Sequence, residues 1–125
     1  MSYSCLFDLD GTVYRGQSPI EGAVNFINRL KQNDIKYKFI TNRSDRSSEE
    51  VSNHLNTMGI ISTPDSIITS AMGVAGLTKG RRVYILGSEN LKDCIRGSEA
   101  IITGDQPEDV VIGFDGKINF DDIRD

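Results

Sequence analysis

Short apolar runs alternate with apolar residues at helical spacing along the first half of the chain. Runs rich in β-branched and aromatic residues predict strands at residues 5–7, 35–40 and 66–70. The segments between and after these strands carry helical patterns. Strand–helix units in succession predict a parallel sheet with right-handed crossovers, which is an α/β fold.

The helices of this half are predicted from their apolar faces and their end signals. Pro19 opens the first helix. Its apolar face consists of residues three or four positions apart: Ala23, Phe26, Ile27 and Leu30. A capping box that begins at Ser47 starts the second helix, and Gly59 ends it. Residues 13–18 predict a polar connection before the first helix, and residues 71–78 predict a third helix.

The second half of the chain begins after a short polar stretch at residues 79–81, which is typical of a domain boundary. Strands are predicted at residues 82–87 and 110–113. A helix is predicted between them at residues 89–95, with Ser88 as its N-cap and Gly97 closing it. A last helix is expected to begin at Phe120. We therefore expect two domains, residues 1–78 and residues 79–125.

Composition and charge exclude several classes of partner. The 125 residues are 38% hydrophobic and carry a net charge of −4, which argues against binding to nucleic acid or to a membrane. No apolar stretch approaches the ~20 residues that span a bilayer, and no signal-peptide pattern is present. Cys5 and Cys94 are expected to be free thiols, and His54 a surface residue of the second helix, because neither residue type has metal-type neighbours. We expect a cytoplasmic protein.

Two carboxylates, one residue apart, directly follow the first predicted strand. Asp8 and Asp10 are followed by Gly11, which allows the backbone to turn sharply or to approach a ligand. Ligands bind at the carboxyl ends of parallel strands, and alternation along an extended strand places both acids on the same side. Converging carboxylates repel each other, which favours a divalent cation between or beside them.

Two other interpretations of this acidic motif are weaker. The same spacing begins EF-hand calcium loops, but the glycine required at position 6 would be Val13 and the glutamate at position 12 would be Pro19. That interpretation fails. A plain strand-to-turn junction with solvated acids is the second alternative, and the later segments of the chain argue against it.

The sequence DLDGT at residues 8–12, after an apolar strand, resembles the first motif of the haloacid dehalogenase superfamily of phosphotransferases. The extension VYRG at residues 13–16 is similar to the 4-nitrophenylphosphatase and sugar-phosphatase-like branch, which has a large α/β cap. The resemblance implies that Asp8 is the nucleophile that forms an aspartyl-phosphate and that Asp10 is the general acid and base. It also implies that Asp8 and the carbonyl of Asp10 hold Mg²⁺.

The next strand ends in Thr41 and Asn42, which resemble the second motif of this superfamily. The resemblance implies that the Thr41 hydroxyl binds the phosphoryl group together with the backbone N–H of Asn42, whereas the residues alone would equally suit a turn. The expected phosphate-binding residues are Leu9, Asp10, Thr41 and Asn42. Arg43 departs from the asparagine usual in the family, and we expect a solvated loop arginine rather than a contact with a substrate anion.

The resemblance covers only the front part of the family's pattern. The catalytic lysine and second acidic pair of the family follow the cap, and no residue here matches them. We therefore expect a truncated form: the N-terminal part of a Rossmann-like core, followed by the start of an α/β cap. The implied function is Mg²⁺-dependent hydrolysis of a small phosphorylated metabolite, impaired in this short form. The alternative is a non-catalytic remnant that binds metal and phosphate, or a module completed by another chain. An unpaired sheet edge would favour homo-oligomers.

Overall fold

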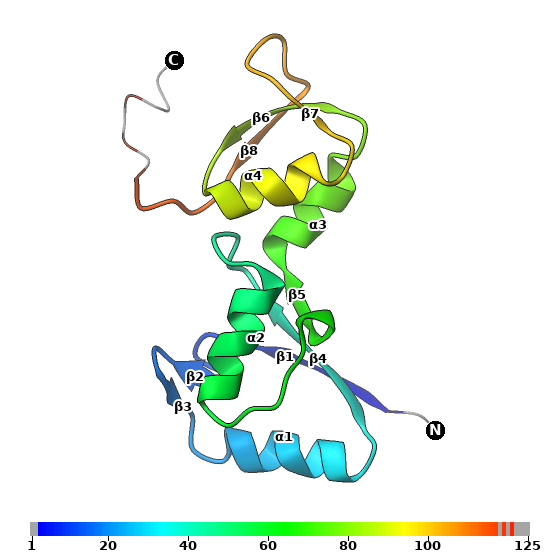
Figure 1. The fold of residues 1–125 in the computed structure, drawn as a ribbon, viewed down its shortest axis with the longest axis vertical. Helices are drawn as coiled ribbons and strands as arrows, with labels where there is room; N and C mark the ends of the chain where they lie inside the picture. The colour runs from blue at the N-terminus through cyan, green and yellow to red at the C-terminus, as the bar shows by residue number, and fades with distance from the viewer. Residues whose placement is uncertain (1–2, 118, 120, 122–125) are drawn as a thin grey trace. The chain divides into compact units, whose positions relative to one another are not determined.

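The computed structural model of the chain describes residues 3–117, 119 and 121 and contains two compact units (Figure 1). The first unit comprises the described residues up to Asn42 together with Ser48–Ile68, and the second unit comprises Arg43–Ser47 and the described residues from Thr69 onward. These units follow from packing contacts within the chain. The domain boundary predicted after residue 78 stays a prediction.

The first unit is built on a three-stranded sheet in the order β1-β4-β5. The strands are β1 (Ser4–Asp8), β4 (Lys36–Thr41) and β5 (Ile67–Thr69), and the 3₁₀ turn η1 (Pro64–Ser66) precedes β5. β1 and β4 run parallel, with Asp8 beside Ile40. The predicted α/β fold with a parallel sheet is confirmed. Among the described residues β1 lies at an edge of this sheet, as expected for a strand that lacks one neighbour.

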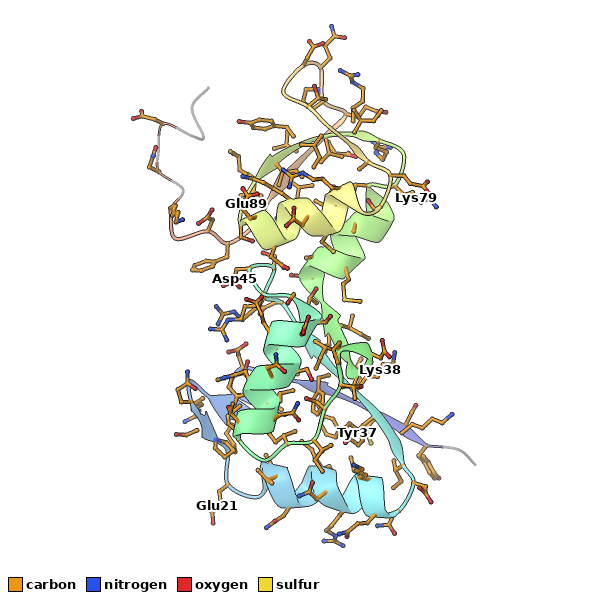
Figure 2. All side chains as sticks on the ribbon, viewed as in Figure 1. Glu21, Tyr37, Lys38, Asp45, Lys79 and Glu89 are labelled. Atoms are coloured by element: carbon orange, nitrogen blue, oxygen red, sulfur yellow. The ribbon has the colours of Figure 1, made fainter. Side chains whose placement is uncertain are left out.

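Residues of β4 alternate between a face that packs into the core and a face open to solvent, as Tyr37 and Lys38 in Figure 2 illustrate. Helices α1 (Ala23–Gln32) and α2 (Ser48–Thr57) pack on the inner face. Their buried residues join those of the strands and loops in one core: Leu9, Val13, Tyr14, Ile27, Phe39, Val51, Leu55, Ile60 and Ile67. The opposite face of the sheet leaves Leu6 59% and Ile40 40% exposed.

Helix α1 begins later than the sequence predicts. Pro19 lies in the short strand β3 (Ser18–Pro19), and Gly22 precedes the helix with φ +82°, a left-handed conformation that glycine adopts without strain. The chain therefore turns after Pro19 instead of entering a helix. Phe26, which was expected on the buried face, is 53% exposed, although its ring contacts that of Phe7 edge-to-face at 6.0 Å between centroids.

Residues 13–18, predicted to be a polar connection, form an antiparallel hairpin. Strand β2 (Tyr14–Arg15) pairs with β3, and Gly16 with φ +58° begins the two-residue loop between them. Val13 and Tyr14 are only 2% and 4% exposed, because both pack into the core of the first unit. The prediction was wrong because two adjacent apolar residues among polar neighbours show no strand alternation.

The second unit contains a separate parallel sheet in the order β7-β6-β8. Its strands are β6 (Arg82–Leu86), β7 (Ile101–Ile102) and β8 (Asp109–Ile112), and its helices are α3 (Ser70–Leu77) and α4 (Glu89–Arg96). The two helices pack against each other and supply four of the six residues of a second core: Ala71, Ala75, Val83, Ile85, Leu91 and Ile95.

Other predictions for the second unit can also be compared with the structure. The Ser88 hydroxyl caps α4 as predicted, because it accepts the backbone N–H of Leu91 at 3.3 Å. Cys94, like Cys5 of the first unit, is a free and half-buried thiol, and burial raises the pKa of Cys94. The helix expected from Phe120 lies outside the described residues. Among the residues that are described, no helix has the length and apolar content needed to cross a membrane.

Candidate active site

The carboxyl ends of β1 and β4 place the first acid and the expected phosphate-binding hydroxyl at one edge of the sheet. β1 ends at Asp8 and β4 ends at Thr41. The two strands are parallel neighbours with Asp8 beside Ile40, so Thr41 lies one residue beyond the partner of Asp8. The structure therefore brings the two sequence motifs together at the end of the sheet where ligands bind in α/β folds. The chemical roles of these residues stay predictions.

A tight loop follows β1 and closes on the carbonyl oxygen of Leu9. The backbone N–H groups of Thr12, Val13 and Tyr14 donate to this oxygen at 3.1, 2.9 and 3.3 Å. Leu9 itself is fully buried in the core of the first unit. The loop is therefore anchored by both a side chain and its own backbone hydrogen bonds.

Asp10 is held within this loop between a buried residue and a glycine. The N–H of Gly11 donates to the carbonyl oxygen of Tyr14 at 2.8 Å, and Gly11 has φ +84°, which favours glycine at this position. Exposure alternates along the chain, since Asp8 and Asp10 are exposed and Leu9 between them is buried. The expectation that both acids face the same side stays a prediction.

The side chain of Thr12 contacts the expected nucleophile directly. Its hydroxyl donates to Oδ2 of Asp8 at 3.2 Å. The sequence analysis gave Thr12 no role, although threonine hydroxyls commonly bond to nearby groups in turns. This hydrogen bond orients the carboxylate, and within the described part of the chain no other hydrogen bond to Asp8 occupies its second oxygen.

Thr41 and Asn42 differ in accessibility at the end of β4. Thr41 is 3% exposed, whereas Asn42 is exposed. Both residues make contacts within the chain. A buried hydroxyl at a strand end has a restricted orientation, which suits a donor that must address one ligand atom. Their role in binding phosphate stays a prediction.

Arg43, the departure from the family pattern, pairs with an acid of its own loop. Its Nε and Nη2 donate to the two carboxylate oxygens of Asp45 at 3.0 and 2.7 Å. These bonds hold the pKa of Asp45 below its usual range. The expectation of a solvated arginine was incomplete, because the sequence does not show that Asp45 lies within bidentate reach.

Asp8 at the end of β1 and Asp10 in the loop after it offer the oxygen donors that Mg²⁺ prefers. Magnesium commonly binds through one or two carboxylates, substrate phosphate and several waters, so Asp8 and Asp10 fit such a site. No group of three or more potential ligands for a metal occurs among the described residues. Within the same residues, neither acid forms an ion pair with lysine or arginine. Binding of Mg²⁺ by these two acids stays a prediction.

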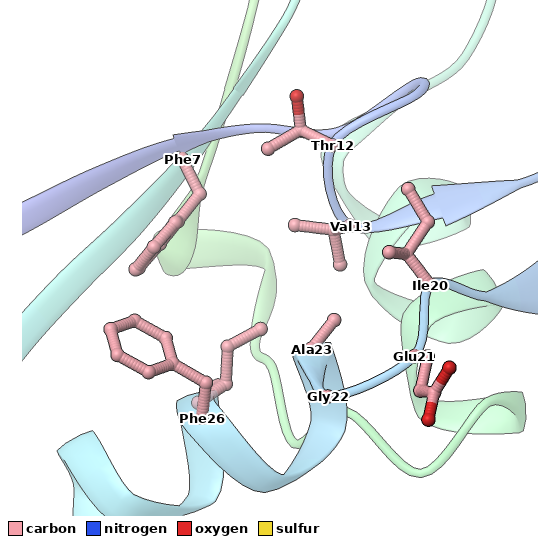
Figure 3. Close-up of a pocket in the computed structure, with 9 residues that line it drawn as sticks. Phe7, Thr12, Val13, Ile20, Glu21, Gly22, Ala23 and Phe26 are labelled. Carbon is pink, nitrogen blue, oxygen red and sulfur yellow. The ribbon is translucent and has the colours of Figure 1, made fainter.

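A small apolar pocket of about 220 Å³ lies between the start of α1 and the loop that carries Asp10, here called the acidic loop (Figure 3). The side chains of Phe7, Phe26 and Ile20 line it, together with Thr12 and Val13. Neither Asp8 nor Asp10 lines this pocket, and the carboxylate in its lining is that of Glu21. Its lining offers little to a charged phosphate, so the pocket does not form the reaction site.

Comparison with known proteins places the chain among hydrolases. A family model described as haloacid dehalogenase-like hydrolase matches residues 5–100. An acid sugar phosphatase of Staphylococcus saprophyticus is 36% identical over 123 residues, which cover 94% of this chain and 48% of that protein. A 5'-nucleotidase of Bacillus subtilis is 32% identical over 120 residues, which cover 93% and 47%.

Solved structures show the same relationship. A glycerol phosphate phosphatase from Mycobacterium tuberculosis, solved in complex with magnesium, superposes with a TM-score of 0.83 at 33% identity. The match covers 97% of this chain and 39% of that one. The chain thus spans about half or less of the length of the relatives it matches.

Proposed function

Because the chain belongs to the haloacid dehalogenase-like hydrolases, we propose that its 125 residues supply the nucleophile, the acid/base and a phosphate-binding hydroxyl of a phosphomonoester hydrolase. The observation that carries this proposal is the meeting of Asp8, Asp10 and Thr41 at the carboxyl ends of two parallel strands. The similar proteins are named as phosphatases or nucleotidases, so a non-catalytic role is not favoured.

The proposed reaction proceeds in two steps on Asp8. An oxygen of the Asp8 carboxylate attacks phosphorus, the ester oxygen leaves with a proton from Asp10, and an aspartyl-phosphate forms. Asp10 then takes a proton from water, which attacks phosphorus and releases inorganic phosphate and free Asp8. The hydrogen bond from Thr12 to Oδ2 of Asp8 supports the proposal, because it orients the nucleophile before attack. Thr41 and the backbone N–H groups of Leu9, Asp10 and Asn42 are proposed to bind the phosphoryl oxygens.

Mg²⁺ is the proposed metal, held by the carboxylate of Asp8 and the backbone carbonyl of Asp10. When bound there, the ion would neutralise charge on the phosphoryl group and lessen its repulsion of the nucleophile. Support comes from the oxygen donors at this edge and from the magnesium complex of the mycobacterial relative.

The substrate is proposed to be a small phosphorylated metabolite. The three relatives are named for sugar phosphates, nucleotides and glycerol phosphate. These molecules share a phosphomonoester and differ in the group that carries it. The class of substrate therefore follows from the shared phosphate, and the carrier group is left open.

Mg²⁺ is expected to stabilise the chain through Asp8. At ten times the dissociation constant, binding to the folded state alone contributes about 1.4 kcal/mol, which raises the melting temperature of a small domain by about 5 °C. Thermal denaturation with and without millimolar Mg²⁺ measures this increment. Asp8→Asn keeps the size of the side chain and an oxygen acceptor for Thr12 but removes the charge, so it is expected to abolish most of the increment.

Asp65→Asn provides the matched control, since Asp65 is an exposed acid in η1 of the same unit. This variant is expected to keep the full Mg²⁺ response. Equal increments in wild type and Asp8→Asn would place the metal elsewhere and reject the proposed site.

The chain is further proposed to self-associate through the β1 edge. An edge strand presents unpaired backbone groups, and here Leu6 on β1 is 59% exposed beside them. Light scattering over a wide range of concentration is expected to show oligomers of the wild type. Leu6→Lys is expected to shift the population towards monomer, because charges on an edge strand oppose pairing.

Leu77→Lys serves as the control for this substitution. Leu77 is 80% exposed on α3 and lies outside the sheets, so a charge there is expected to leave the association unchanged. A monomeric wild type at every concentration would contradict the proposal, as would equal effects of the two lysine substitutions.

A further inference from the structure

His54 of α2 contacts the hairpin that follows the acidic loop. Its Nε2 lies 3.0 Å from the carbonyl oxygen of Gly16 in the hairpin turn. A carbonyl oxygen only accepts hydrogen bonds, so Nε2 carries the proton and donates. Gly16 and His54 are 38 positions apart in the sequence, so this bond joins two separate segments of the first unit.

The same histidine also holds the first strand of the hairpin. The rings of His54 and Tyr14 meet edge-to-face, with centroids 5.0 Å apart and planes at 88°. Tyr14 is 4% exposed, so its ring has little freedom to move away from this contact. His54 therefore binds the hairpin at two points, the Tyr14 ring and the Gly16 carbonyl.

The hairpin needs such an anchor because it is very short. β2 and β3 contain two residues each, and a two-stranded hairpin alone is at best marginally stable in water. Its further ties include the buried side chain of Val13 and the bond from the Ile20 N–H to the Val13 carbonyl at 2.9 Å. These two ties lie at the open end of the hairpin, whereas His54 contacts its turn.

Tyr14 connects this anchor with the acidic loop, which carries Asp10. The carbonyl of Tyr14 accepts the Gly11 N–H at 2.8 Å, and the N–H of Tyr14 donates to the Leu9 carbonyl at 3.3 Å. Asp10 forms an isolated bridge with the same residue. A shift of Tyr14 would therefore change both backbone bonds that flank Asp10.

We propose that His54 is a positioning residue that clamps the β2–β3 hairpin to α2 and thereby fixes the loop that carries Asp10. This inference rests on the proposed function only in giving Asp10 a catalytic purpose. The clamp itself is a statement about the geometry of the loop. It assigns a role to the lone histidine other than that of a surface residue or a metal ligand.

Amide hydrogen exchange of the 125-residue chain, followed by NMR, tests the clamp. In His54→Ala the amide of Gly11 is expected to exchange about tenfold faster, because its acceptor Tyr14 loses its support. The amide of Phe39 in β4 should keep its wild-type rate. His54→Gln can still donate to the Gly16 carbonyl and is expected to restore slow exchange at Gly11.

Two further variants separate the contacts of His54. His54→Phe keeps an aromatic edge against Tyr14 but has no donor, so it is expected to resemble His54→Ala and replaces that variant if alanine prevents folding. Asn53→Ala, at an exposed neighbouring position of α2, should leave Gly11 unchanged. The clamp is rejected if Gly11 exchange is unaffected in His54→Ala and His54→Phe, or if Gly11 and Phe39 accelerate together.

Mg²⁺ titration of the same samples distinguishes this inference from the proposed function. If the loop positions Asp10 for the metal, His54→Ala is expected to weaken Mg²⁺ binding several-fold, with His54→Gln near wild type. Faster Gly11 exchange in a protein whose wild type ignores Mg²⁺ would support the clamp and overturn the metal site. A normal Mg²⁺ response with unchanged Gly11 exchange would overturn the clamp and support the metal site.

Discussion

Phe39→Ala is expected to lower the free energy of unfolding of the first unit by about 3–5 kcal/mol, the usual cost of deleting a fully buried phenyl group. Phe39 is 0% exposed, and its ring packs near those of Phe7 and Tyr37, with centroids 6.1 and 5.5 Å away. Truncation leaves a cavity beneath β4, the strand that carries Thr41. Urea denaturation measures the loss directly.

Phe26→Ala provides the matched comparison, because the same atoms are removed from a side chain that is 53% exposed. Its cost is expected to be about 1 kcal/mol, in line with the smaller apolar area lost. Similar losses for the two substitutions would contradict the burial of Phe39 in the core of the first unit.

Strands and helices with clear periodicity could be predicted from the sequence. A strand was predicted at residues 35–40 from a run rich in β-branched and aromatic residues, and the structure gives β4 at Lys36–Thr41 with alternating burial. The helix after Ser88 was predicted from its cap and its closing Gly97, and α4 spans Glu89–Arg96. These elements are determined by local patterns, so tertiary contacts did not alter them.

Elements that depend on contacts distant in sequence could not be predicted. Val13 and Tyr14 enter the core because helix α2 packs over them, and nothing in residues 13–18 reports on that helix. The start of α1 was misplaced because Pro19 suits a strand end as well as a first helical turn. Phe26 fits the apolar period of its helix but lies at the rim of the covered surface.

The candidate site also combines features that the sequence predicts with features that depend on contacts distant in sequence. The order of Asp8, Asp10 and Thr41 along predicted strands was enough to place them at one sheet edge, because parallel strands share their carboxyl ends. The Thr12–Asp8 bond and the contact of His54 with the hairpin depend on how the loop folds back. Sequence spacing shows which residues can meet at this edge, whereas the support around them is visible only in the structure.

Turnover of 4-nitrophenyl phosphate by the 125-residue chain is expected to stay at or near background, even with Mg²⁺ present. The proposed attack by Asp8 would bring an anionic nucleophile against an anionic ester. Among the described residues no lysine or arginine pairs with Asp8 or Asp10, and no third acid joins them around a metal. Loss of one preorganised electrostatic contact typically costs about 10²–10³ in rate. Among the described residues, both a cation paired with the two acids and a third acidic ligand for the metal are lacking.

The measurement compares the wild-type chain with Asp8→Asn from matched preparations, at millimolar Mg²⁺ and over a range of protein concentration. Equal, near-background rates are expected, because the nucleophile alone gives little acceleration without charge compensation. Robust turnover that disappears in Asp8→Asn would contradict this expectation. If that turnover rose more steeply than protein concentration, a second copy of the chain would be completing the site. Strictly proportional turnover would instead show that the residues around Asp8 compensate the charge within one copy.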